Sequence, residues 1–222
     1  SLYGGGSTGG LINIVTKKGQ QERQVDLELG GKSGFANSND HDERVAAAVS
    51  GGTDHASGRL SVAYQRFGGW YDGNNDALVL DNTQTGLQHS DRLDVMGTGT
   101  INIDDNRQLQ LVTQYYKSQG DDYGLYLGKN MSAVTGEGKA YTTDGLNSDR
   151  VPGTERHLIS LQYSDADFYG QNLVSQIYYR DESLTFYPFP TLTKGQVSSF
   201  SSSKQDTDQY GAKNTLNSQP LD

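Results

Sequence analysis

The sequence predicts an all-β fold, a transmembrane antiparallel β-barrel of which about eight strands are present. Three observations support this prediction. Apolar and polar residues alternate in segments of about ten residues, which is the period of a strand with two unlike faces. The connections between these segments alternate between short and long. Mean hydropathy is only -0.70, as expected where one face of every strand is polar.

Each predicted strand is justified by apolar residues that share one parity, and no segment has the composition of a helix. In chain order the strands and their apolar faces are 23–31 with Val25, Leu27 and Leu29; 43–51, which is less regular; 59–66 with Leu60, Val62 and Tyr64; 91–104 with Leu93, Val95, Ile101 and Ile103; 108–117 with Leu109, Leu111 and Tyr115; 156–165 with Ile159, Leu161 and Tyr163; and the less regular 172–182 and 206–217.

The connections distinguish a membrane barrel from a soluble sandwich. Short polar turns are expected at 52–55, 104–106 and 165–167, whereas the other connections are long, up to the stretch 118–154. Long loops at one end only are typical of outer-membrane barrels, and strands in lipid must close so that every backbone group is paired. Aromatic residues near the strand ends predict girdles at the membrane interfaces. These are Phe67, Trp70, Tyr71, Tyr115, Tyr116, Phe168, Tyr169, Tyr178, Tyr179, Phe186 and Tyr187.

Composition and motifs argue against several function classes. A net charge of -9 disfavours a nucleic-acid-binding surface, and the chain has no cysteine. Gly4 to Gly9 match G-x-G-x-x-G, but a β-branched run follows where a phosphate-binding helix would have to begin. The four histidines are scattered without a catalytic or metal-binding pattern. We therefore expect no enzyme, no metal site and no cofactor.

The opening stretch LYGGGSTGGLINIVTKKG resembles the end of the plug domain of TonB-dependent receptors. Later stretches such as DHDERVAAAVSGG, GRLSVAYQRFGGWYDGN and LQLVTQYYKSQGDDYGLYLGK resemble the members of that family that take up ferric hydroxamate–citrate siderophores. The resemblance implies that residues 1–20 end the plug and 21–222 begin the barrel. It also implies a bacterial outer-membrane location, TonB as an energy-supplying partner through a segment outside this chain, and iron only as ferric siderophore cargo. We expect the chain to be a fragment of such a receptor, in contact with outer-membrane lipid.

The resemblance implies an anionic ligand, for which arginine and tyrosine donors are suited. If the alternation holds, Arg92, Arg156 and Arg180 face the barrel interior near the long-loop ends of their strands, beside Tyr116 and Tyr178. An equally weighted interpretation is that these arginines only balance inward carboxylates such as Asp94 and Glu182. Possible loop contacts to the ligand are Tyr123, Tyr126, Tyr187 and Phe189.

Two other function classes stay open at this point. In a secreted or surface-anchored adhesion or carbohydrate-binding module, the apolar faces would form the core between two sheets. A passive porin would have the same strands, but the plug-like opening argues against it.

Overall fold

In the computed structural model, the residues that can be described form strands and the turns that join them. It describes residues 22–76, 78, 88–120, 126–127, 141–142, 152–186, 189–193 and 196–218. Its main sheet is built from β1 (Gln24–Lys32), β2 (Asp42–Gly52), β3 (Ala56–Phe67), β4 (Ser90–Asn102), β5 (Arg107–Gly120), β8 (Gly153–Phe168), β9 (Gln171–Thr185) and β12 (Lys204–Ser218). Two small antiparallel pairs, β6 (Tyr126–Leu127) with β7 (Tyr141–Thr142) and β10 (Phe189–Thr193) with β11 (Gln196–Ser201), accompany it.

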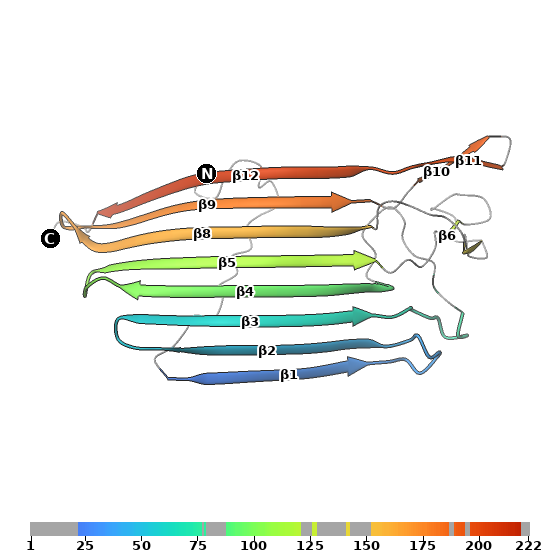
Figure 1. Ribbon diagram of the computed structural model, residues 1–222, viewed down its shortest axis with the longest axis horizontal. Coiled ribbons are helices and arrows are strands. Elements are labelled where there is room, and N and C mark those ends of the chain that lie inside the picture. Colours follow the sequence, from blue (N-terminus) through green and yellow to red (C-terminus); the bar gives the residue numbers. More distant parts are fainter. Residues whose placement is uncertain are drawn as a thin grey trace.

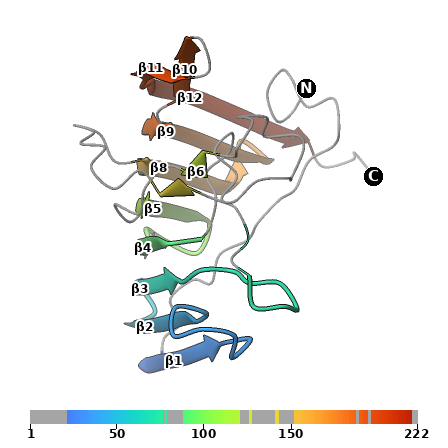
Figure 2. The same cartoon turned by 90° about the vertical axis from the view of Figure 1, so that its right-hand side faces the viewer.

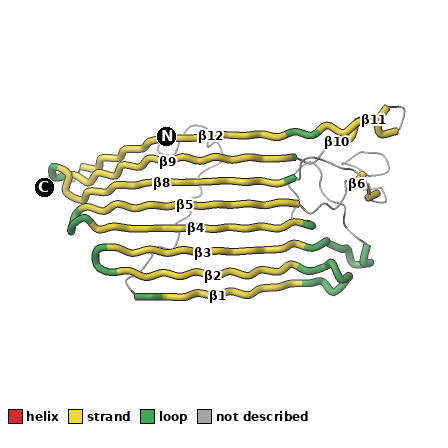
Figure 3. Tube along the Cα trace, viewed as in Figure 1, coloured by secondary structure: helices red, strands yellow, loops and turns green. Residues whose placement is uncertain are grey.

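The eight long strands form one sheet in the order β1-β2-β3-β4-β5-β8-β9-β12, and every neighbouring pair is antiparallel (Figure 1). The short turns all lie at one end of the strands, and the long connections lie at the other end (Figure 3). The predicted all-β fold and its eight strands are therefore confirmed. The four short strands of the two small pairs were not predicted.

One predicted turn is wrong. The sequence suggests a turn at 165–167, but β8 continues to Phe168 through an irregularity in its pairing with β9 between Asp165 and Phe168. The chain reverses instead at Tyr169 and Gly170, whose φ angles are 53° and 78°. Positive φ at both central residues is the geometry that matches the twist of a tight hairpin.

The β4–β5 turn is closed by Asp104. Its Oδ1 accepts hydrogen bonds from the backbone N–H groups of Asn106 and Arg107, and Arg107 Nε donates to Oδ2 at 2.6 Å. The Arg107 hydrogen bond is the main reason that the pKa of Asp104 is lowered. The ionised Asp104 therefore stabilises the turn fully at pH values above the ordinary pKa of an aspartate. This stabilisation is lost as the pH falls through the lowered pKa and the carboxylate is protonated.

The register places all the predicted apolar positions on one side of the sheet. Directly opposite residues of an antiparallel pair share a face, and tracing the pairs strand by strand brings Leu27, Leu60, Leu93, Leu111 and Leu161 to the same side. Leu111, for example, is directly opposite Leu161. We refer to this side as the apolar face and to the other as the polar face.

Within the described residues, no second layer covers the apolar face, as the end-on view in Figure 2 shows for the labelled strands. Leu27 is 79% exposed and Leu29 is 82% exposed. Other exposed members of this face are Val25, Val45, Val49, Leu60, Val62, Ile101, Leu111, Ile159, Leu161, Ile177 and Leu216. The only buried hydrophobic residues in the described part of the chain are Ala48 and Phe67, so the sheet has no interior core of its own.

The described residues contain no helix of a length and hydrophobicity that would cross a membrane.

Tyrosines mark both borders of the apolar face, and each turns its hydroxyl toward a carboxylate. At the long-loop end, Tyr64 donates to Asp91 at 2.7 Å and Tyr179 donates to Asp208 at 2.6 Å. At the short-turn end, Tyr163 donates to Asp165 at 3.2 Å. Such rings have an apolar body and a polar tip, as an interfacial girdle requires.

The girdle prediction is wrong for three of the aromatic residues named in the sequence. Successive residues of a strand point to opposite faces, so in the pairs Tyr115–Tyr116 and Tyr178–Tyr179 only the odd-numbered ring lies on the apolar face. Tyr116, Tyr178 and the buried Phe67 lie on the polar face instead.

Candidate functional site

The five residues predicted to face inward all lie on the polar face, four of them in the long-loop half of their strands and Tyr178 at the middle of its strand. Arg92 belongs to β4, Tyr116 to β5, Arg156 to β8, and Tyr178 and Arg180 to β9. The register makes Tyr116 the direct neighbour of Arg156. The alternation therefore predicted the correct face for each of them.

Arg156, Arg180 and Glu182 form a three-membered charge cluster. Glu182 is directly opposite Arg156 across the β8–β9 pair, and Arg180 precedes Glu182 by two residues on the same face. Arg180 Nη2 donates a hydrogen bond of 2.9 Å to Glu182 Oε1. Arg156 Nε lies 2.9 Å from Glu182 Oε2 but has no hydrogen-bond geometry with it. One carboxylate therefore pairs with two guanidinium groups, which leaves one positive charge in the cluster.

Tyr116 supports Arg156 from the neighbouring strand. The Arg156 Cζ atom lies 5.3 Å from the centre of the Tyr116 ring, which is within the range of a cation–π contact. The adjacent carboxylate of Asp94 is occupied by Gln114, whose Nε2 donates to it at 2.9 Å and 3.2 Å. Within the described residues Asp94 forms no ion pair with Arg156, so the interpretation that these arginines balance inward carboxylates applies to Glu182 but not to Asp94.

Arg92 lies apart from this cluster. It is opposite Ser118 of β5, and its Cζ atom stacks 4.8 Å from the centre of the Phe67 ring. Its Nε is buried without a hydrogen-bond partner, and the described part of the chain offers it no ion pair. Sequence reasoning placed Phe67 in an interfacial girdle, although its parity relative to Leu60 already puts it on the polar face.

Tyr178 does not join the arginine cluster. A Cβ atom built on Gly211, which is opposite Tyr178 on β12, would lie 2.6 to 2.8 Å from the ring carbons and hydroxyl oxygen of Tyr178. The ring therefore leans over β12 and occupies the space that Gly211 leaves open.

The predicted loop contacts cannot be placed as side chains. Tyr123 and Tyr187 lie outside the described residues. Tyr126 begins β6 and Phe189 begins β10, and only the backbone of these two positions is described.

Two hollows differ sharply in chemistry. One of 560 Å³ lies over β1 to β4, where Ala46, Ala48, Ser61 and Ala63 form a floor of short side chains on the polar face. Its rim carries cross-strand ion pairs, Arg59 with Asp26 at 2.7 Å and Arg44 with Glu28 at 2.9 Å. Each of these arginines has its own carboxylate.

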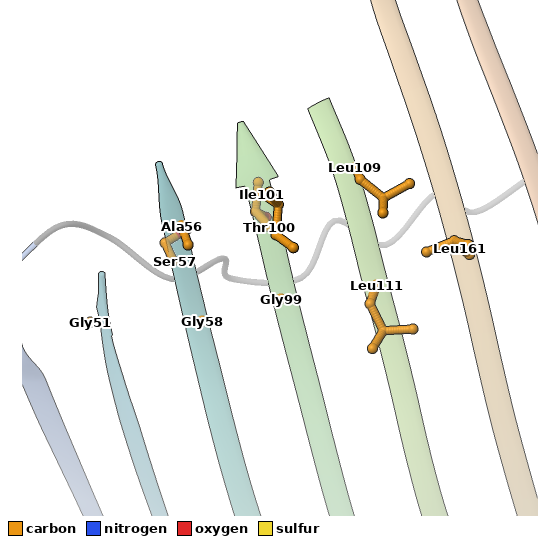
Figure 4. A pocket seen from close by; sticks show the side chains of 10 residues that line it. All are labelled: Gly51, Ala56, Ser57, Gly58, Gly99, Thr100, Ile101, Leu109, Leu111 and Leu161. Carbon is orange, nitrogen blue, oxygen red and sulfur yellow. The ribbon is translucent and has the colours of Figure 1, made fainter. Parts of the chain in front are cut away.

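The second hollow, of 330 Å³, lies on the apolar face (Figure 4). Gly51, Gly58 and Gly99 follow one another across three strands, and the missing side chains leave a gap beside Leu111 and Leu161. No charged residue lines this hollow. It offers no cationic donor for an anion, so the candidate site is on the polar face.

The chemistry of the polar-face cluster is that of binding. Guanidinium groups and a phenol donate hydrogen bonds to oxygen-rich anions. Within the described residues no group of three or more His, Cys, Asp or Glu side chains could hold a metal ion.

Three known receptor proteins match this chain over its whole length. The chain is 73% identical over 224 residues to a ferric aerobactin receptor of Klebsiella pneumoniae and 72% identical over 224 residues to that of Escherichia coli. It is 39% identical over 227 residues to a rhizobactin receptor of Rhizobium meliloti. All of this chain is matched, but it spans only 31%, 31% and 30% of these relatives. No protein-family profile matches, and no solved structure matches.

Proposed function

We propose that this chain is a segment of a TonB-dependent receptor of the bacterial outer membrane that takes up a ferric siderophore, namely ferric aerobactin. The observation that carries the proposal is the 73% identity to a ferric aerobactin receptor along the entire chain. The sheet is part of a closed barrel, and its polar face lines the interior.

The two faces of the sheet support a place in the membrane. From Leu93 on β4 to Ile103, the residue that follows the strand's last residue, an apolar series whose ends are ten residues apart includes Val95, Gly97, Gly99 and Ile101. At about 3.3 Å per residue this stretch is about 33 Å long. A strand tilt of about 40° reduces it to about 25 Å, which is the height of the apolar band of an outer-membrane barrel. The exposed leucines and valines are then covered by lipid.

The arginine cluster supports recognition of an anion. Arg156 and Arg180 share the carboxylate of Glu182, which leaves one net positive charge in this cluster although the chain as a whole has a net charge of -9. A ferric hydroxamate–citrate complex is anionic, and hydrogen bonds between a guanidinium group and an anion are stronger than hydrogen bonds between neutral groups. We assign Arg156, Arg180 and Tyr116 to the ligand contact, with Arg92 further along the interior wall; Tyr178, whose ring leans over β12, lies outside this contact.

The hollow over β1 to β4 supports an interior filled by protein. Its floor of alanine and serine side chains leaves room on the polar face, and its rim charges are neutralised in pairs. A plug ending at residue 20 and packed against these strands would use this space. The role is transport without catalysis or a resident cofactor, and TonB is the partner that supplies energy.

The alternative of a β-rich adhesion or carbohydrate-binding module requires that a second sheet cover the apolar face. In the described part of the chain no element does so.

The test is a titration of the complete, folded receptor with ferric aerobactin. Replacing Arg156 and Arg180 together with alanine removes charged hydrogen bonds worth about 1.5 to 3 kcal/mol each, so binding should weaken at least about tenfold, since about 1.4 kcal/mol is a factor of ten. The matched control is Arg44→Ala with Arg59→Ala, which removes two arginines from the same face at pairs that have their own carboxylates. Heat-modifiable gel mobility verifies folding. Equal affinities of wild type and the Arg156/Arg180 variant would contradict the assignment.

A further inference from the structure

We infer that Glu182 is a placeholder carboxylate: in the unliganded receptor it holds the guanidinium groups of Arg156 and Arg180 in position, and it gives them up to carboxylates of the bound ligand. The inference rests on the proposed function and extends it to a residue that competes with the ligand. It predicts that Glu182 weakens, rather than strengthens, binding of an anionic siderophore.

The first argument is the sharing of one carboxylate. The other arginines of the polar face that form ion pairs have one carboxylate each, as Arg44 has Glu28 and Arg59 has Asp26. Arg156 and Arg180 instead converge on the two oxygens of Glu182, at 2.9 Å each. Arginines that serve only as structural ion pairs are expected to have one acidic partner each. Two arginines that share one carboxylate retain a positive charge that is available to an anionic ligand.

The second argument is the incomplete satisfaction of Arg156. Its Nε is buried and has no hydrogen-bond partner in the described part of the chain, although Glu182 Oε2 is 2.9 Å away. A buried donor without an acceptor costs free energy. Once Glu182 moves aside, a ligand oxygen in line with this N–H would recover that cost, which Glu182 in its present orientation does not.

The third argument is accessibility. The side chains of Arg156, Arg180 and Glu182 are 34%, 37% and 24% exposed, so a ligand in the interior can reach all three. Tyr116 supports Arg156 from the side through the cation–π contact at 5.3 Å. Because this support does not involve Glu182, Arg156 stays in place when the carboxylate releases it.

The ligand class that follows is an iron chelate with free or peripheral carboxylates. Such a group can take bidentate hydrogen bonds from a guanidinium, which match the geometry of a carboxylate. The exchange replaces one carboxylate by another, and no covalent bond changes.

The experiment measures ferric aerobactin binding to the complete receptor with Glu182→Gln. Glutamine keeps the shape and one acceptor oxygen but removes the competing charge, so affinity should rise about three- to tenfold. Binding should also become more sensitive to salt, because the screened attraction is larger. Glu182→Thr, which is also uncharged and favours strands, is measured in parallel so that the test does not depend on the folding of a single variant.

The matched control is Asp94→Asn, which removes a negative charge from the same face at a carboxylate held by Gln114. It should change affinity less than Glu182→Gln. An equal gain in both variants would mean that only the overall interior charge matters and would overturn the inference. So would unchanged or weaker binding by folded Glu182→Gln and Glu182→Thr receptors.

Failure of the proposed function and failure of the placeholder role of Glu182 give different results. If the wild-type receptor does not bind ferric aerobactin, the proposed function fails and the inference with it. If the wild type binds and Arg156→Ala with Arg180→Ala weakens binding, but Glu182→Gln does not strengthen it, the site stands and only the placeholder role is refuted.

Discussion

An arginine at position 111 should destabilise the receptor strongly, whereas one at position 112 should not. Leu111 is on the apolar face, 40% exposed, and opposite Gly99. Gly99 lies between Leu93 on β4 and Ile103 just after it, the ends of the apolar series, so Leu111 is near the centre of the band. Arginine at the bilayer midplane costs about 2–4 kcal/mol, or a factor of about 30 to 700 in the folding equilibrium at about 1.4 kcal/mol per tenfold.

The assay is urea unfolding of the complete receptor in lipid vesicles, with Leu111→Arg compared to Val112→Arg. Val112 is the next residue on β5 and belongs to the polar face, opposite Thr98 and Ser160, so the same new charge enters the interior there. We expect the unfolding midpoint to fall markedly for position 111 and much less for position 112. Equal losses at both positions, or a larger loss at position 112, would refute the assignment of the apolar face to lipid.

Two further predictions concern the Tyr178–Gly211 contact and the two edge strands of the sheet. Gly211→Ala should displace the Tyr178 ring, because the new Cβ would lie 2.6 Å from a ring carbon. The thermal stability of the receptor should fall, and Tyr178→Ser in the double variant should restore it; additive losses of stability would contradict this contact. Residues 1–222 alone should aggregate without detergent, because among the described residues β1 and β12 each pair on one side only and nothing covers the apolar face. Sedimentation in plain buffer measures this, and a stable monomer that melts cooperatively would speak against it.

The strands and their faces could be predicted because side chains in a sheet have a period of exactly two residues, which a sequence displays directly. Leu60, Val62 and Tyr64 reveal their common face without knowledge of any neighbour. The same logic placed Arg92, Arg156 and Arg180 on the polar face. It failed at residues 165–168, where an irregularity shifts the pairing and the alternation no longer indicates where the strand ends.

Contacts between strands could not be predicted in the same way. The sharing of Glu182 by two arginines depends on the register that sets Arg156 opposite Glu182, and one strand does not contain that information. Tyr178 was expected beside the arginines, but a glycine on the neighbouring strand gives its ring another place. Adjacent aromatic residues were assigned together to a girdle, although a strand must send them to opposite faces.

The most direct test of the account is a spin-label scan along β8 in the complete receptor in lipid vesicles, since this chain has no native cysteine to interfere within it. Single labels at positions 158 to 163 report two quantities. The first is the frequency of collision with oxygen, which concentrates in lipid. The second is the mobility of the label with and without ferric aerobactin. We predict high oxygen collision at Ile159, Leu161 and Tyr163, low collision at the even positions between them, and a ligand-dependent change at Leu158, which is opposite Arg180. Collision without a two-residue period, or an equal ligand response at Leu158 and Ile159, would contradict the account.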